Sequence, residues 1–171
     1  LNKDVEIFLT QKAITFSRQG IAQTHLVFAQ YKNKPELIAY FSLANKGFTV
    51  GDAFKMSKNM KRKINKFANY SNGIKAYTMS APLIAQLGKN FSNGLNTLIT
   101  GDELLKMACD TVSEAQRILG GRFVYLECEE KEVLLDFYKS NGFVEFGKRK
   151  LDKDEKDDLC GEYLMQLLKY L

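Results

Sequence analysis

The sequence predicts a single α/β domain over residues 1–171, built on a mixed, twisted sheet with flanking helices. Two patterns carry that prediction. Near the N-terminus, two apolar runs flank turn-forming residues, which indicates an antiparallel hairpin. Further along, an apolar run, a long amphipathic segment and a second apolar run are typical of two parallel strands joined by a crossover helix. The length of 171 residues suits one domain with a sizeable core.

The N-terminal part supplies a helix and the hairpin. Apolar residues recur at helical spacing from Asp4 to Arg18, so we expect a helix there. Strands are predicted over Thr24–Tyr31 and Glu36–Ala44, with Asn33-Lys34-Pro35 as the turn between them. A further extended piece, Gly47–Val50, leads out of the hairpin.

The middle of the chain is less regular. Between Gly51 and Gly73, weak helical spacing of Met56, Met60, Ile64 and Phe67 predicts a helical or partly ordered insertion that ends in loop residues. Ile74–Met79 is predicted as a short strand or an extended approach to the apolar strand Pro82–Leu87.

The strongest pattern starts with that apolar strand. A polar loop, Gly88–Thr100, leads into a long amphipathic helix that opens at Gly101-Asp102 and closes at Gly120-Gly121. Its apolar stripe is predicted to comprise Leu104, Leu105, Ala108, Val112, Ala115, Ile118 and Leu119. First-turn N–H groups have no intrahelical partner, and the helix dipole favours negative charge there. This unit therefore predicts a ligand that carries phosphate.

The C-terminal part continues with three strands and a short helix. Strands are predicted over Arg122–Cys128, Phe143–Arg149 and Gly161–Leu168, the last two around an acidic loop. Lys131–Ser140 is predicted as a helix. Its inward face is expected to hold Val133, Leu134 and Phe137.

Cysteine usage and hydropathy narrow the class of protein. Cys109, Cys128 and Cys160 are an odd number without paired metal spacing, so we expect packed, reduced thiols in a cytoplasmic protein and no metal site. No apolar run approaches the roughly 20 residues needed to span a bilayer. The acidic residues among Leu1–Glu6 do not fit an export signal. The single histidine, His25, is expected to be structural.

Charge is distributed unevenly along the chain. The formal net charge is +5, and Lys55–Lys66 holds a dense group of cations with no acid among them. Acids gather instead in Glu127–Glu132 and Asp152–Asp158. The basic segment fits a phosphate-rich partner, and it fits a merely solvated face equally well.

A short motif adds a resemblance to this pattern. Phe137-Tyr138, followed after three residues by Gly142-Phe143, resembles the FYxxxGF signature of the GCN5-related N-acetyltransferase (GNAT) superfamily. The order of elements fits over nearly the whole chain, and the N-terminal half most resembles the branch containing aminoacyl-tRNA-acetylating toxins. The resemblance implies a GNAT-like sheet whose central parallel pair is splayed to admit the pantetheine arm of acetyl-CoA.

The chain departs from the family pattern in its glycine loop. Gly101 matches the last glycine of that loop, whereas Ile99 stands where the preceding glycine is expected. Lys131 replaces an asparagine that often touches the cofactor. These differences affect which residues contact the pyrophosphate. They do not remove the helix N-terminus on which the phosphate is expected to lie.

The resemblance also implies a reaction, in which an amine attacks the acetyl group of acetyl-CoA directly. Tyr138 occupies the family's position for the acid that protonates the CoA thiolate. Glu127 or Glu129, at the end of a strand, could serve as base, although such a strand end is more often only solvated. Backbone groups of the strand and the helix N-terminus are expected to hold acetyl-CoA, with Asn96 as a weaker loop candidate: Leu87, Gly88, Lys89, Thr100, Gly101 and Asp102.

The acceptor and the alternatives stay open at this stage. Lys61, Arg62 and Lys63 are expected to meet RNA phosphates, for example of an aminoacyl-tRNA, but a small-molecule amine or a protein amino group explains the sequence equally well. A catalytically inactive GNAT-like binding module is one alternative, which the altered glycine loop favours and Tyr138 opposes. A plain RNA-binding protein is another. A homodimer is left open.

Overall fold

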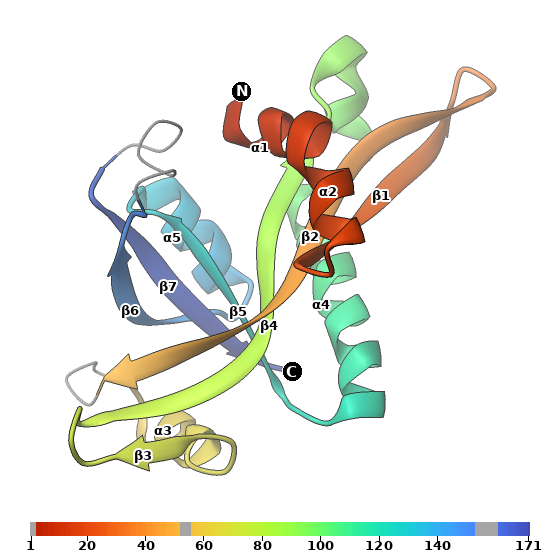
Figure 1. The fold of residues 1–171 in the computed structure, drawn as a ribbon. Helices are drawn as coiled ribbons and strands as arrows, with labels where there is room; N and C mark the ends of the chain where they lie inside the picture. Colours follow the sequence, from red (N-terminus) through yellow and green to blue (C-terminus); the bar gives the residue numbers. More distant parts are fainter. Residues whose placement is uncertain (1–2, 52–55, 153–160) are drawn as a thin grey trace. The chain divides into compact units, whose positions relative to one another are not determined.

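The computed structural model describes residues 3–51, 56–152 and 161–171. Its strands form one sheet in the order β1-β2-β4-β5-β7-β6, with β3 paired to β4 (Figure 1). The strands are β1 Ala22–Tyr31, β2 Lys34–Gly51, β3 Asn69–Ser71, β4 Ala76–Lys89, β5 Phe123–Glu129, β6 Val144–Lys150 and β7 Tyr163–Tyr170. The helices are α1 Lys3–Ile7, η1 Phe8–Lys12, α2 Ala13–Arg18, α3 Lys58–Ile64, η2 Ser92–Leu98, α4 Gly101–Leu119 and α5 Glu132–Ser140. The predicted α/β class is confirmed.

The chain divides into two compact units. Unit 1 comprises Leu1–Ala44 and Ile84–Ala115, and unit 2 comprises Asn45–Leu83 and Gln116–Leu171. The strands β2 and β4 each contribute residues to both units. As the strand–helix–strand pattern predicts, α4 connects the neighbouring strands β4 and β5.

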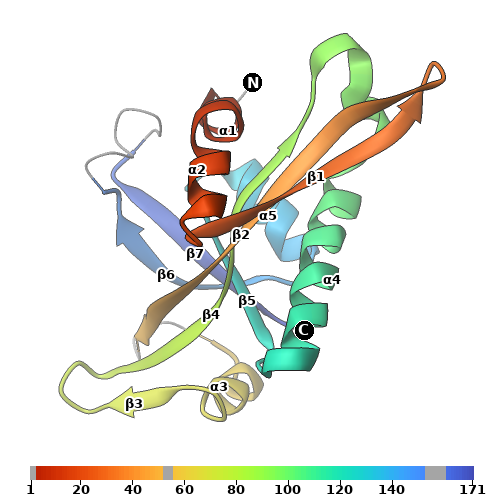
Figure 2. The same cartoon turned by 45° about the vertical axis from the view of Figure 1, so that its right-hand side comes forward.

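The N-terminal helical segment is anchored in unit 1 by aromatic side chains. It runs from Lys3 to Arg18, as predicted, with a π-helical turn, η1, in its middle. The Phe8 ring stacks on the Tyr40 ring, with centroids 6.4 Å apart, and the Tyr40 hydroxyl donates a hydrogen bond to the Val5 carbonyl at 2.6 Å. The helix α2 packs on β1 (Figure 2). Gly20 follows with a φ of +69°, the left-handed conformation that ends helices.

The hairpin of unit 1 turns at a different place from the one predicted. Tyr31 pairs with Lys34, so the turn consists of Lys32 and Asn33, whose φ values are 50° and 63°. A two-residue turn with positive φ at both positions matches the twist of the flanking strands. Pro35, whose ring fixes φ near −65°, lies in β2 instead. His25 stacks on Phe41 across the hairpin at 4.8 Å, which fits its expected structural role.

An antiparallel group of strands carries the core of unit 2. The strand β7 lies between β5 and β6 and pairs with both. Phe48 packs on Tyr125 with centroids 4.4 Å apart, and on Phe146 at 4.9 Å. All three side chains are buried. Cys109 in unit 1 and Cys128 in unit 2 are buried, as expected, whereas Cys160 lies outside the described residues.

Several strand predictions are corrected by the structure. The separate strands predicted at Ile74–Met79 and Pro82–Leu87 are one strand, β4, and Gly47–Val50 is the end of β2. Residues 69–71, predicted as loop, form β3 because they pair with β4. Local patterns located the extended segments, but pairing with neighbours decided their length.

Three apolar side chains predicted to be buried are exposed. Ile118 and Leu119 lie in the last turn of α4, whose buried stripe ends at Val112. Val133 is exposed in the first turn of α5, a helix without fully buried residues. Periodicity continues to the end of a helix whether or not the neighbouring element does, so it overestimates burial at helix ends. None of the described helices is long and apolar enough to cross a membrane.

Candidate functional site

One group of candidate residues lies at the end of β4 in unit 1. Leu87, Gly88 and Lys89 are the last residues of this strand, and Gly88 is buried. A Cβ atom at Gly88 would overlap the Val5 side chain and lie 3.0 Å from Cε1 of Tyr40. Gly88 therefore lets α1 and β2 pack closely against the strand.

The loop after β4 is tied to its surroundings at both ends. The Asn90 side-chain amide donates to the Leu37 carbonyl at 2.8 Å, and the Asn90 N–H donates to the Ile38 carbonyl at 2.8 Å. The Lys89 ammonium donates to the Ile99 carbonyl at 2.8 Å, which places a cation next to the start of α4. Asn96 is half-buried within η2.

The N-terminus of α4 is closed by a capping box. The Glu103 carboxylate accepts from the Thr100 N–H at 2.7 Å and from the Thr100 hydroxyl at 2.8 Å. The Glu103 N–H donates to the Thr100 hydroxyl at 3.1 Å. Hydrogen bonds from the Thr100 backbone and then from its side chain lower the pKa of Glu103, because they stabilise the charged form.

This capping box changes the predicted pyrophosphate contacts. The Thr100 N–H, predicted to meet a phosphate, is engaged by a carboxylate of the same helix. Gly101 and Asp102 stay in the first turn, as predicted, beside a second acid at position 103. An anion that uses the Thr100 N–H has to displace the Glu103 carboxylate first.

A separate group of candidate residues lies in unit 2 around Glu127. Its Oε2 accepts from Nε of Arg149 at 2.7 Å, and its Oε1 accepts from Nε2 of Gln166 at 2.8 Å. Gln166 is buried. A Cβ atom at Gly147 would lie 2.7 Å from Oε1 of Gln166, so glycine at this position leaves room for the Gln166 amide. Glu127 is thus held by β6 and β7, and each of its oxygens keeps a second lone pair that could accept a proton.

Tyr138 lies half-buried on α5 in unit 2. Its ring packs against Phe137 at 5.0 Å and against Phe143 at 6.0 Å, so the FYxxxGF residues contact one another. Burial, with a smaller effect of Cys128, raises the pKa of Tyr138 above its ordinary value. Burial also raises the pKa of the Cys128 thiol to about 11. Both groups stay protonated near neutral pH.

The predicted RNA-binding residues lie on α3, also in unit 2. Ser57 caps this helix by accepting from the Met60 N–H at 3.2 Å, and Ile64 anchors it in the core. Arg62 is exposed, whereas Lys61 is half-buried. The Lys63 ammonium lies over the Tyr170 ring, 4.0 Å from its centroid. Consecutive residues on a helix point about 100° apart, so these three cations do not share a face.

Three residues of the site escaped the sequence analysis. Glu103 could have been found, because Thr100-Gly101-Asp102-Glu103 has the T-x-x-E spacing of a capping box. Arg149 and Gln166 could not, because they meet Glu127 only through strand pairing across β5, β7 and β6.

Solved structures of AtaT and KacT are similar to this chain. A tyrosine-to-phenylalanine mutant of the AtaT toxin matches with a TM-score of 0.63 and 19% identity, covering 98% of this chain and 77% of that chain. A tyrosine-to-phenylalanine mutant of KacT matches with a TM-score of 0.61 and 15% identity, covering 96% and 81%.

This chain has the fold of these toxins.

A third match, AtaT complexed with acetyl-methionyl-tRNAfMet, has a TM-score of 0.59 and 18% identity and covers 95% of this chain and 81% of that chain. The AtaT and KacT fold confirms the GNAT-like architecture that the FYxxxGF motif predicts. The sequence matches no protein-family model and no curated protein.

Proposed function

We propose that this chain is an N-acetyltransferase that moves an acetyl group from acetyl-CoA to an amine. The observation that carries the proposal is the fold shared with AtaT over nearly the whole chain, since AtaT structures include complexes with acetyl-CoA. The packed FYxxxGF residues and the loop that leads into α4 support it.

The residues at the start of α4 suit the phosphates of the cofactor in part. The exposed N-terminus of a helix that runs from Gly101 to Leu119 attracts anions, and the Lys89 ammonium adds a positive charge. The negative charge of the Glu103 carboxylate opposes the binding of phosphates at this helix end. We assign the pyrophosphate to the N–H groups of Gly101 and Asp102, and to the Thr100 N–H once Glu103 turns away. Asn96 and the β4 backbone at Leu87, Gly88 and Lys89 hold the rest of the cofactor.

Bound acetyl-CoA supplies an acetyl thioester, which is activated for attack by a neutral amine. The Tyr138 hydroxyl holds the proton that the departing thiolate needs. A buried phenol with a raised pKa keeps that proton until a stronger base forms beside it. A backbone N–H of β4 is suited to donate to the carbonyl oxygen as negative charge develops on it.

Deprotonation of the amine is assigned to Glu127. Arg149 and Gln166 each donate one hydrogen bond to Glu127, which fixes the carboxylate and leaves one lone pair on each oxygen for an incoming ammonium group. A Glu127→Gln variant tests this step: its rate should fall most at low pH, where less of the amine is neutral. An unchanged pH profile would assign the deprotonation to water.

The acceptor that we favour is an aminoacyl-tRNA. A solved structure shows AtaT complexed with acetyl-methionyl-tRNAfMet, and α3 of this chain presents exposed cations. Acetylation of a panel of charged tRNAs with labelled acetyl-CoA should identify the acceptor. Transfer to small amines or proteins, but to no charged tRNA, would contradict this choice and leave the acetyltransferase assignment intact.

Calorimetric titration with acetyl-CoA, beside unacetylated CoA, tests the main proposal. We expect stoichiometric binding of acetyl-CoA and an acetyl-transfer rate that falls roughly 10²- to 10⁴-fold in Tyr138→Phe, because only the proton donor is lost. Tyr31→Phe is the matched control. Binding without transfer by the wild-type chain would favour the inactive binding module. Absence of binding would exclude both readings.

A further inference from the structure

Three strands of unit 2 line up three residues in a single row. In the ladder of β5, β7 and β6, Glu127 lies opposite Gln166, and Gln166 lies opposite Gly147. The Gln166 amide spans this row. Its Nε2 donates to Oε1 of Glu127 at 2.8 Å, and its Oε1 would lie 2.7 Å from a Cβ atom at Gly147. Glycine on β6 therefore gives the amide its place beside Glu127.

An irregularity in β6 sets this row. Glu145 pairs with Leu167 and Gly147 pairs with Gln166, so Phe146 is an extra residue in β6. Side chains alternate between the two faces of a sheet. Without the bulge, Phe146 would lie opposite Gln166, and Gly147 would belong to the other face. Bulges are common next to active sites, where they redirect side chains.

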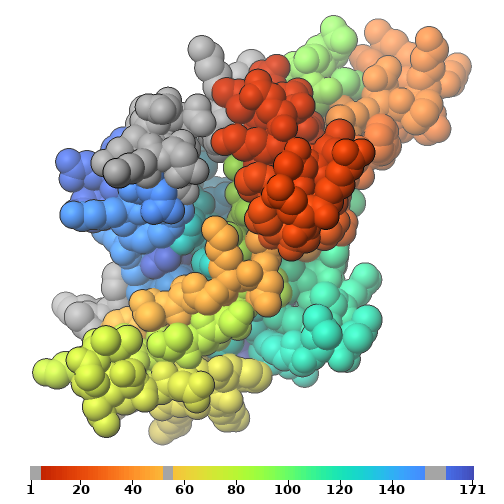
Figure 3. Space-filling view, in the orientation of Figure 1, coloured from red at the N-terminus to blue at the C-terminus, as the bar shows by residue number. Residues whose placement is uncertain are grey.

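The bulge also places Arg149 on the face that carries Glu127. Arg149 lies opposite Leu164, and Leu164 lies opposite Glu129, two positions along β5 from Glu127. The Arg149 side chain reaches Glu127 diagonally, with Nε 2.7 Å from Oε2. The strand β6 is the last of the sheet, and its residues lie at the surface in Figure 3. The cation therefore approaches from the edge of the sheet, whereas the amide approaches from within it.

The two donors differ in how firmly they hold the carboxylate. Gln166 is 9% exposed, and the Glu127 side chain is 14% exposed. The Arg149 side chain is 28% exposed, and its Nη1 also donates to the Lys150 carbonyl at 3.1 Å and lies 3.8 Å from Asp152. The torsion that turns a glutamate carboxylate has broad minima, so one donor leaves its orientation loose and two donors fix it. Gln166 supplies the more deeply buried of the two contacts.

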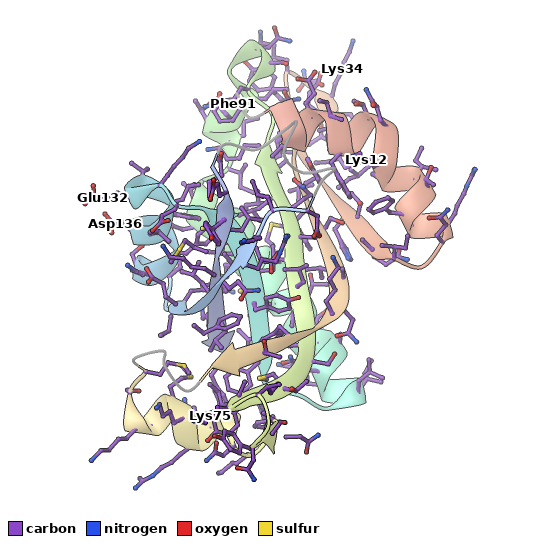
Figure 4. The ribbon with its side chains drawn as sticks, turned by 60° about the vertical axis from the view of Figure 1, so that its left-hand side comes forward. Lys12, Lys34, Lys75, Phe91, Glu132 and Asp136 are labelled. Carbon is purple, nitrogen blue, oxygen red and sulfur yellow. The ribbon has the colours of Figure 1, made fainter. Side chains whose placement is uncertain are left out.

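The acids on the outside of α5 do not compete for these donors. Figure 4 shows Glu132 and Asp136 on the outer side of this helix, and both are exposed. On β5, the Glu129 carboxylate pairs with Lys131 at 2.6 Å. Glu127 receives both donors, and the two bonds determine the directions in which its remaining lone pairs point.

We propose that Gln166 is a positioning residue for Glu127, which it holds with the free lone pairs of the carboxylate directed toward the amine of the acceptor. This inference rests on the proposed function, in which Glu127 deprotonates the amine. The proton passes from the ammonium nitrogen to Glu127, and the Gln166 amide keeps both of its own protons. Because Gln166 is uncharged, it orients the carboxylate without opposing proton uptake as a second cation would.

Steady-state acetyl transfer by Gln166→Met tests the proposal. Methionine has a similar length but no N–H donor, so kcat should fall roughly 10- to 100-fold while KM for acetyl-CoA stays as in wild type. Gln116→Met is the matched control, because the Gln116 amide donates to the Phe123 carbonyl at 2.7 Å, at the other end of β5. It loses an equivalent hydrogen bond and should keep the wild-type kcat. Thermal melts check that both variants fold.

A double-mutant cycle separates positioning from a merely structural role. In a Glu127→Gln background, Gln166→Met should cause no further loss of kcat, because Gln166 acts through the Glu127 carboxylate. Gly147→Ala is a second route to the same defect. Its Cβ atom displaces the Gln166 amide, so kcat should fall although both Glu127 and Gln166 are present.

Three outcomes would overturn the proposal. These are a wild-type kcat in Gln166→Met, an equal loss from Gln166→Met with and without the Glu127 carboxylate, and a Glu127→Gln variant as fast as wild type. Each of them leaves the acetyltransferase assignment intact. Absence of acetyl transfer by the wild-type chain would instead remove the proposed function, and this role of Gln166 with it.

Discussion

The N-terminus of α4 and the exposed side of α3 both carry positive charge, but only the N-terminus of α4 has a carboxylate hydrogen-bonded to it. At α4, the Glu103 carboxylate binds the Thr100 N–H and hydroxyl, so the positive end of the helix has an internal anion. At α3 and just after it, the exposed cations Lys58, Arg62 and Lys66 have no ion-pair partner among the described residues. An anion that binds at α4 therefore has to compete with Glu103, whereas no carboxylate of the described residues pairs with the exposed cations of α3.

The two regions also differ in what holds them in place. The helix α4 buries several side chains along its first turns, and the loop before it is bonded to β2 through Asn90. The helix α3 has seven residues and one buried side chain, Ile64. A helix this short is not stable alone, so its position depends on tertiary packing.

Removing the anchor of α3 should have the largest effect on stability. The Ile64 side chain is fully buried, so Ile64→Ala should lower the free energy of unfolding by about 2–5 kcal/mol through lost burial and a cavity. Ile74→Ala, at an exposed isoleucine of the same unit, should change it little. Chemical denaturation measures both. Equal effects would mean that α3 does not depend on Ile64.

Adding a methyl group at Gly88 should destabilise the strand β4, from which the loop leads into α4. Gly88→Ala should lower the free energy of unfolding by about 1–3 kcal/mol, because the added methyl group meets Val5 and Tyr40. Gly51→Ala is the control, since nothing lies within 4 Å of a Cβ at that position. A Gly88→Ala variant as stable as wild type would mean that α1 shifts freely from β4.

Opening the capping box should have a smaller effect. Thr100→Ala removes the hydroxyl that bonds the Glu103 N–H and carboxylate, and should lower the free energy of unfolding by about 1 kcal/mol. Ser113→Ala, in the interior of the same helix, controls for side-chain loss. Thermal unfolding of both variants decides whether the hydrogen bonds seen at Thr100 stabilise the helix.

Removing the negative charge of Glu103 should leave the positive end of α4 without an internal anion. Glu103→Gln keeps the bond to the Thr100 N–H and removes the negative charge, so acetyl-CoA should bind roughly two- to fivefold more tightly. Glu114→Gln, on the same helix but distant from its start, should leave calorimetric affinity unchanged. Weaker binding in Glu103→Gln would show that the carboxylate supports the ligand instead of competing with it.

The charge of Glu103 should also give a small pH dependence. Its pKa is lower in the folded chain than the ordinary value of 4.5, so the unfolded chain takes up this proton first as pH falls. The stabilisation from this carboxylate is complete above that value and is lost as pH falls through the folded pKa. Melting temperatures of wild type and Glu103→Gln should differ at neutral pH and converge as pH falls below the lowered pKa of Glu103.

Sequence and structure agree best where the residues that form a feature are close together in the sequence. The helix α4 begins and ends where Gly101 and Gly120 predict, and the FYxxxGF residues pack together on α5 and the turn after it. Agreement is poorest where partners lie far apart in sequence. Nothing near Glu127 indicates that Arg149 and Gln166 bind it, and nothing near Tyr70 indicates a strand that pairs with Tyr77.

Local sequence patterns were enough to predict the α/β class, the order of the elements, the amphipathic helix after the loop and the concentration of cations before β4. These features depend on periodicity, turn residues and charge, which act over a few neighbouring positions. Three further features became visible only in the folded chain: the Glu103 carboxylate caps the start of α4, the Lys63 ammonium lies over the Tyr170 ring, and Val133 is exposed to solvent. Rotamers and distant neighbours set those contacts, and neither is encoded in the local pattern.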